Sequence, residues 1–123
     1  MPFIADAIFD LALARLDTES NRLDITTQEC ANYTEATSTY TKGNKTSLTV
    51  GAPADRTPSG RKVTVAAITA NAVSGTGTVT HWAITYTTSS RLDSTGALSA
   101  SKAVVSGDTF DLAAFDIGFA DAT

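Results

Sequence analysis

The 123-residue sequence has one cysteine, one histidine and few charged side chains, and each shortage excludes a class of protein. With Cys30 alone, the chain can form no internal disulfide, whereas secreted domains of this size often carry several. A zinc site built on two histidines or several cysteines is equally excluded, because His81 and Cys30 are single. Charged residues make up 18% of the chain, but a hydrophobic fraction of 42% is too high for a disordered protein.

The sequence also lacks features that are typical of membrane-spanning, secreted or nucleic-acid-binding proteins. No run approaches the roughly 18 apolar residues of a membrane span. Asp6 and Asp10 interrupt the apolar start, and the basic region of a signal peptide is missing. A net charge of −4 and a pI near 4.7 disfavour nucleic-acid binding. We therefore expect a protein made in a reducing cytoplasm, with neither membrane nor nucleic acid as partner.

Motifs of enzymes are missing as well. There is no Walker loop, no Gly-x-Gly-x-x-Gly, no Gly-x-Ser-x-Gly and no EF-hand spacing among the scattered acidic residues. His81 lies inside a strongly β-prone segment and is interpreted as a packed side chain, and Cys30 as a small buried hydrophobe. The sequence thus predicts no catalytic, cofactor-binding or metal-binding residue. By elimination, it favours a binding or structural role.

Hydroxyl groups carry the polarity of the chain instead, with 21 Thr and 11 Ser. Residues 1–18 form the only predicted helix. Ile4, Ile8 and Leu11 recur at helical spacing, and Phe9, Leu13 and Leu16 form an adjoining stripe. This apolar arc is wider than one small sheet requires. The helix either closes one end of a β core or docks on a partner as well.

The remaining chain alternates with period two, as half-buried strands do. Residues 28–46 and 51–60 are predicted loops, and Val63, Val65 and Ala67 are expected to point inward. A change of parity predicts a bulge near Ala113 and Ala114. The expected fold is mainly β: a single-domain antiparallel β-sandwich or jelly-roll-like barrel over 22–119 with one N-terminal helix. The predicted strands are 22–26, 47–50, 62–68, 78–86, 92–99 with a break at 93–95, 102–105, and 109–119.

Three regions are candidate partner-contact surfaces. They are the helix, the long 28–46 segment and the 51–61 loop, beside which Arg56, Arg61 and Lys62 form a basic cluster. Tyr33 and Tyr40 could instead pin the long segment to the domain, and the cations of the third region could simply be solvated. The candidate contact residues are Phe3, Ile4, Ile8, Leu11, Tyr33, Tyr40, Arg56, Arg61 and Lys62.

Several segments of the chain resemble a family of small virion proteins of tailed bacteriophages and prophages. The most distinctive is Thr80-His81-Trp82-Ala83, which is followed by a hairpin. The helix followed by Arg22-Leu23-Asp24-Ile25 also resembles the start of these proteins. Thr85-Tyr86-Thr87-Thr88 departs from the acidic, Gly-rich turn of the relatives. The other segments that carry the resemblance are 51–55, 59–65, 75–84, 96–99, 105–110 and 114–117.

The resemblance implies a non-enzymatic virion component with a compact β fold. It implies a decoration or cement subunit on the capsid exterior, bound to the major capsid protein, or alternatively a tail, fibre or head–tail connector component. Such accessory proteins generally act as homo-oligomers, often trimers, at symmetry sites. Removing residues 1–17 is expected to abolish oligomerisation or shell binding.

Overall fold

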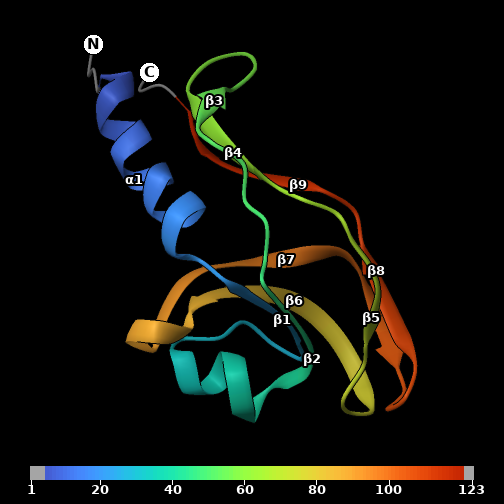
Figure 1. The fold of residues 1–123 in the computed structure, drawn as a ribbon. Helices are drawn as coiled ribbons and strands as arrows, with labels where there is room; N and C mark the ends of the chain where they lie inside the picture. Colours follow the sequence, from blue (N-terminus) through green and yellow to red (C-terminus); the bar gives the residue numbers. More distant parts are fainter. Residues whose placement is uncertain (1–4, 121–123) are drawn as a thin grey trace.

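The computed structural model describes residues 5–120, which form one helix followed mainly by strands (Figure 1). A π-helix at Glu35–Thr39 and a 3₁₀ turn at Thr87–Ser89 are the other helical pieces. The prediction of a mainly β fold with one N-terminal helix is confirmed. The elements are α1 Asp6–Glu19, β1 Arg22–Thr26, β2 Thr41–Thr46, β3 Ala54–Asp55, β4 Arg61–Val65, β5 Ile68–Ala72, β6 Gly77–Tyr86, β7 Arg91–Val104, β8 Thr109–Leu112 and β9 Phe115–Phe119.

The strands form two layers. One is a four-stranded antiparallel sheet in the order β2-β1-β6-β7. The other is a ribbon in two parts, β3-β4-β9 and β5-β8, because β4 leads into β5 and β8 leads into β9. Strands β7, β8 and β9 each have one unpaired edge within the described sheets. The arrangement is that of a sandwich rather than a closed barrel.

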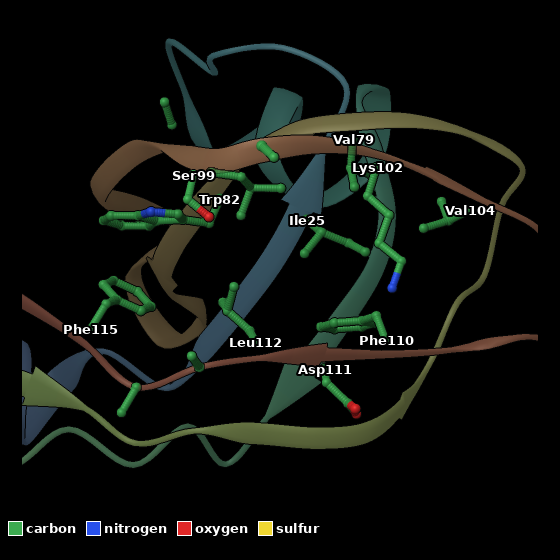
Figure 2. Close-up of a pocket in the computed structure, with 15 residues that line it drawn as sticks. Ile25, Val79, Trp82, Ser99, Lys102, Val104, Phe110, Asp111, Leu112 and Phe115 are labelled. Atoms are coloured by element: carbon green, nitrogen blue, oxygen red, sulfur yellow. The ribbon is translucent and has the colours of Figure 1, made fainter.

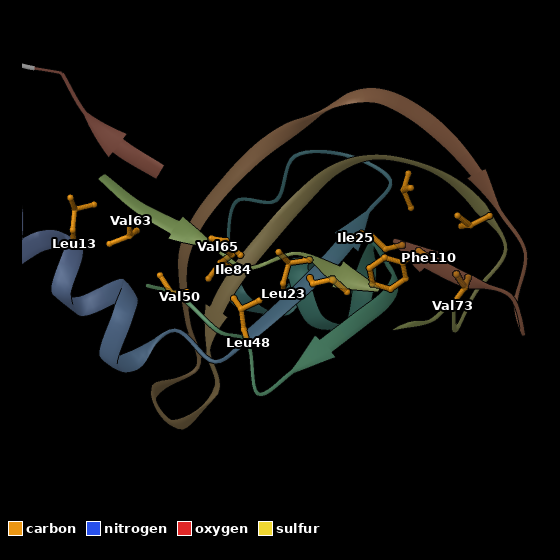
Figure 3. Close-up of a cluster of buried hydrophobic side chains, with 13 residues drawn as sticks. Leu13, Leu23, Ile25, Leu48, Val50, Val63, Val65, Val73, Ile84 and Phe110 are labelled. Carbon is orange, nitrogen blue, oxygen red and sulfur yellow. The ribbon is translucent and has the colours of Figure 1, made fainter. Parts of the chain in front are cut away.

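One hydrophobic cluster fills the space between the layers and reaches α1 (Figure 3). Val63 and Val65 point inward as predicted, but Ala67 is exposed. The chain bends at Ala66 and Ala67 between β4 and β5, so Ile68 takes the next inward position. The buried members of the cluster are Leu13, Leu23, Ile25, Leu48, Val50, Val63, Val65, Ile68, Val73, Val79, Ile84, Val104 and Phe110.

Two sequence predictions between residues 28 and 50 are wrong. The predicted 28–46 connection contains the π-helix and β2, a strand whose sequence Thr-Lys-Gly-Asn-Lys-Thr has no apolar alternation. Gly43 is buried in β2, where a Cβ would lie 3.0 Å from the Phe110 ring and from the Ala72 carbonyl oxygen, so a larger side chain would require these neighbours to move. The predicted strand at 47–50 is reduced to a single bridge between Val50 and Val65, although Leu48 is still buried.

Strand β7 is continuous, so the predicted break at 93–95 is wrong. Irregular pairing with β6 replaces it: Ile84 faces Ser94 and Thr85 faces Leu92, which leaves Asp93 as an extra residue. A second irregularity places residues 98–101 opposite a single residue of β6. The irregularity expected near Ala113 and Ala114 is present, but the single strand predicted over 109–119 is wrong, because these residues divide it into β8 and β9 in different sheets.

Candidate partner-binding surfaces

Helix α1 divides its wide apolar arc between the protein interior and solvent. Phe9 and Leu13 are buried, and Leu16 packs against the main cluster. Ile8 and Leu11 remain 57% and 70% exposed. Predicted contact residues Phe3 and Ile4 lie outside the described residues. Ile8 and Leu11 therefore do not contribute to the core of the described domain.

Contacts from three strands fix the direction of α1. The rings of Phe9 and Phe119 stack with centroids 5.2 Å apart. The Arg61 Nε donates to Asp10 Oδ1 at 2.8 Å, which joins the helix to β4. At the C-terminal end, the Arg91 Nη2 of β7 donates to Glu19 Oε1 at 3.2 Å. The exposed face of α1 therefore has a defined orientation relative to the sandwich.

The 28–46 segment is held to the domain by its own side chains. Tyr40 packs against a small cluster of Cys30, Ala36 and Ala83, and Tyr33 is half-buried. Beneath it, the fully buried Asp24 accepts hydrogen bonds from Arg22 Nε at 2.7 Å and from Thr41 Oγ1 at 2.6 Å. Because Tyr40 is engaged inside the domain, its packing agrees with the pinning interpretation.

The three candidate cations also have partners within the chain. Arg61 bridges Asp10 and Asp55. Lys62 Nζ contacts Asp116 Oδ2 at 3.0 Å, and Arg56 Nη1 donates to the carbonyl of Ser59 at 3.0 Å. This basic cluster thus uses its positive charge to hold β3, β4, β9 and α1 together.

A groove that the sequence did not predict opens between the two layers along β7, β8 and β9 (Figure 2). Its volume is about 520 Å³, within the range of ligand and side-chain pockets. Most of its walls are apolar or aromatic. The lining residues are Ile25, Val79, Trp82, Ala97, Leu98, Ser99, Ala100, Lys102, Val104, Phe110, Asp111, Leu112, Ala113, Ala114 and Phe115.

The groove exists because both layers are interrupted at the same place. Residues 98–101 bulge out of β7, and Ala113 and Ala114 separate β8 from β9. Trp82 forms the aromatic end with Phe115, their ring centroids 4.6 Å apart. Gly96 lies opposite Trp82 in the register, and a Cβ at this glycine would overlap the indole ring. The parity change near Ala113 was the sequence signal at this site, whereas the pairing of Gly96 with Trp82 is known only from the strand register.

The opposite end of the groove carries charge. Lys102 is exposed and has no ion-pair partner among residues 5–120 (Figure 2). Asp111 uses Oδ1 to accept a hydrogen bond from the backbone N–H of Ala70 at 2.6 Å. Its other carboxylate oxygen has no hydrogen-bond donor within the described part of the chain. The groove therefore combines an aromatic end with a zwitterionic end.

Other side chains that could take part in catalysis or metal binding have contacts within the fold. Nδ1 of His81 lies 2.8 Å from Thr80 Oγ1. Cys30 is buried as expected, and burial raises the pKa of its thiol. Within residues 5–120, no three His, Cys, Asp or Glu side chains are grouped as metal ligands would be. No helix in that range has the length and apolar character needed to cross a membrane.

Comparisons with protein-family models, with curated proteins and with solved structures give no match to this chain. Four of the segments for which we expect a resemblance to phage virion proteins meet at the groove. They supply Val79 and Trp82, then Ala97 to Ser99, then Phe110, then Ala114 and Phe115. These four segments thus line the same groove.

Proposed function

We propose that this protein is a non-enzymatic structural component of a tailed-phage virion, acting as a decoration or cement subunit on the capsid exterior. The observation that carries the proposal is the resemblance of the chain to small virion proteins, together with the convergence of its segments on one interlayer groove. The resembling residues shape strands, bulges and an apolar surface. Such features serve packing and association.

In this role the protein binds the assembled shell more tightly than it binds the free major capsid protein. Preferential binding to the assembled state stabilises that state by mass action. Many copies on neighbouring capsomers add avidity without requiring a tight single contact. The hydroxyl-rich surface suits this use, since covering Ser and Thr costs less side-chain entropy than covering Lys or Glu.

The experiment is to prepare particles that lack the protein and add it back in purified form. We expect it to bind at hundreds of copies per particle, measured by gel densitometry, and to raise the temperature at which the shells rupture. Shells that neither bind the protein nor gain heat resistance contradict the proposal.

The alternative is a tail, fibre or head–tail connector component, favoured by labels that some resembling proteins carry. Copy number separates the two, because the shell offers hundreds of equivalent sites and a tail a few dozen at most. A few dozen copies confined to the tail in particle images would replace the capsid proposal with this one.

A further inference from the structure

The two layers of the sandwich are joined by backbone pairing along one side. An antiparallel bridge between Gly43 and Val73 links β2 to the end of β5. Next to it, the carbonyl of Lys42 accepts a hydrogen bond from the backbone N–H of Ser74 at 2.8 Å. The β2 edge of the four-stranded sheet is therefore closed onto the ribbon.

The opposite side of the sandwich is open. Strand β7 pairs with β6 alone, β8 with β5 alone and β9 with β4 alone. Among residues 5–120, no backbone hydrogen bond beyond this pairing involves residues 91–104 or 109–119. The outer N–H and C=O groups of β7 and of β8 thus lack partners in the described part of the chain.

The groove between these two edges reaches the hydrophobic core. Ile25, Val79, Val104 and Phe110 line it and also belong to the buried cluster. Figure 2 shows β7 and β8 on opposite sides of the groove, with the side chains of Ile25 and Phe110 between them. Whatever closes the groove must therefore present apolar side chains toward the core.

The spacing of the layers suits a single added strand. Packed sheets lie about 10 Å apart, which is twice the separation of about 4.8 Å between paired strands. A strand midway between the edges of β7 and β8 can consequently pair with both. A helix would leave both edges unpaired, because its backbone hydrogen bonds are made within the helix.

The charge of the groove favours an uncharged occupant. Among the described lining residues, Lys102 and Asp111 alone carry charge. They lie on the two facing strands and have opposite signs, and Asp111 already accepts the backbone N–H of Ala70 at 2.6 Å. The groove has no net charge, so a charged segment gains no electrostatic complementarity there.

We propose that the groove takes an extended, uncharged segment of the shell protein as an added β strand between β7 and β8. Alternate apolar side chains of the segment face Ile25 and Phe110, as the period of a strand requires. The added strand closes the open side of the sandwich and covers both free edges. This inference rests on the proposed function, which makes the shell protein the partner.

The experiment compares two groove-filling variants with two matched controls in the full-length protein. Ala100→Trp in β7 and Ala113→Trp after β8 fill the groove from exposed alanines on its two sides. The controls are Ala103→Trp, at an exposed alanine of β7 outside the groove, and Ala67→Trp, in the corresponding link between β4 and β5. Circular dichroism confirms that each variant is folded before binding is measured.

Each protein is titrated onto shells that lack it, and the bound amount is measured by gel densitometry. We expect both controls to bind like the wild type and both groove-filling variants to bind at least about tenfold more weakly. Groove-filling variants that bind like the wild type overturn this inference and leave the proposed function intact. A wild type that does not bind shells overturns the proposed function and, with it, the shell protein as the occupant.

Hydrogen exchange of the wild type, free and bound to shells, tests whether the occupant is a strand. We expect backbone amides of β7 and β8 to exchange more slowly in the bound protein, while amides of β2 on the closed side stay unchanged. Binding without protection at β7 and β8 overturns strand addition. The same protection in concentrated free protein also overturns the proposal, because a second copy would then occupy the groove.

Discussion

Two buried threonines show at the residue scale how differently the same side chain can be accommodated. Thr26 and Thr85 are both fully buried in the four-stranded sheet. The hydroxyl of Thr26 donates to the carbonyl of Gln28 at 2.8 Å. The hydroxyl of Thr85 has no partner, and within residues 5–120 it is the one buried side-chain polar atom in that state. A buried group without a hydrogen bond costs about 1–3 kcal/mol.

Replacing each threonine with valine should therefore change stability in opposite directions. Thr85→Val removes an unpaired hydroxyl at nearly constant volume and should raise the free energy of unfolding by about 1 kcal/mol. Thr26→Val leaves the Gln28 carbonyl with only the weak Cys30 Sγ donor at 3.7 Å and should lower that free energy by about 1 kcal/mol. Urea unfolding of the two variants measures both effects. Equal destabilisation by the two substitutions would mean that Thr85 is hydrogen-bonded in solution.

At the scale of elements, α1 depends on charged contacts at its C-terminal end. Glu19 binds Arg15 in the same helix at 2.9 Å and Arg91 of β7. The hydrogen bond from Arg15, helped by Arg91, lowers the pKa of the Glu19 carboxyl below its ordinary value of 4.5, against an opposing effect of desolvation. The beginning of β7 contributes further, because Asp93 binds both Arg91 and Ser20.

This lowered pKa predicts how α1 responds to acid. The ionised Glu19 stabilises the folded state above pH 4.5, and this contribution is lost as the pH falls through the lower pKa of the folded protein. Glu19→Gln should therefore melt below the wild type at pH 7, with the difference closing in strong acid. Asp17→Asn on the same helix serves as the control, since Asp17 forms no ion pair within the described residues. A melting-temperature difference that does not vary with pH would show that the Glu19 charge is unimportant.

The elements that the sequence predicted well are those whose pattern is set by local chemistry. The strand at β6 is rich in β-branched and aromatic residues, and β1 alternates over five residues. Strand β2 was missed because its pairing partner β1, rather than its own side chains, makes it a strand. Ile8 and Leu11 were predicted as surplus apolar residues and are exposed, whereas the groove required knowledge of how two layers are aligned.

At the scale of the whole molecule, one core joins almost every element. Leu13 of α1, Val63 and Val65 of β4, Ile84 of β6 and Phe110 of β8 belong to a single cluster. The 1–17 truncation considered from the sequence would remove Leu13 and Phe9 from the interior as well as the exposed apolar face of α1. Leu11→Asp is the cleaner test of association, because it leaves the core unchanged.

A shared core predicts that the chain unfolds as one unit. Trp82 reports on the groove, and far-ultraviolet circular dichroism reports on the backbone of all elements. In urea the two signals should follow one transition with the same midpoint and slope. Two separated transitions would show that α1 or the ribbon forms an independent unit.

The sequence by itself determined the class of the fold. Period-two alternation and hydroxyl-rich faces indicate strands, a wide apolar arc indicates a helix, and a parity change marks the division at Ala113 and Ala114. These features depend on neighbouring residues, so they can be read along the chain. Only the tertiary structure decided that the β7 bulge lies over that division and opens a groove, and that Arg61 and Lys62 are paired inside the domain. Those outcomes depend on residues far apart in sequence, whose alignment is set by packing of the two layers.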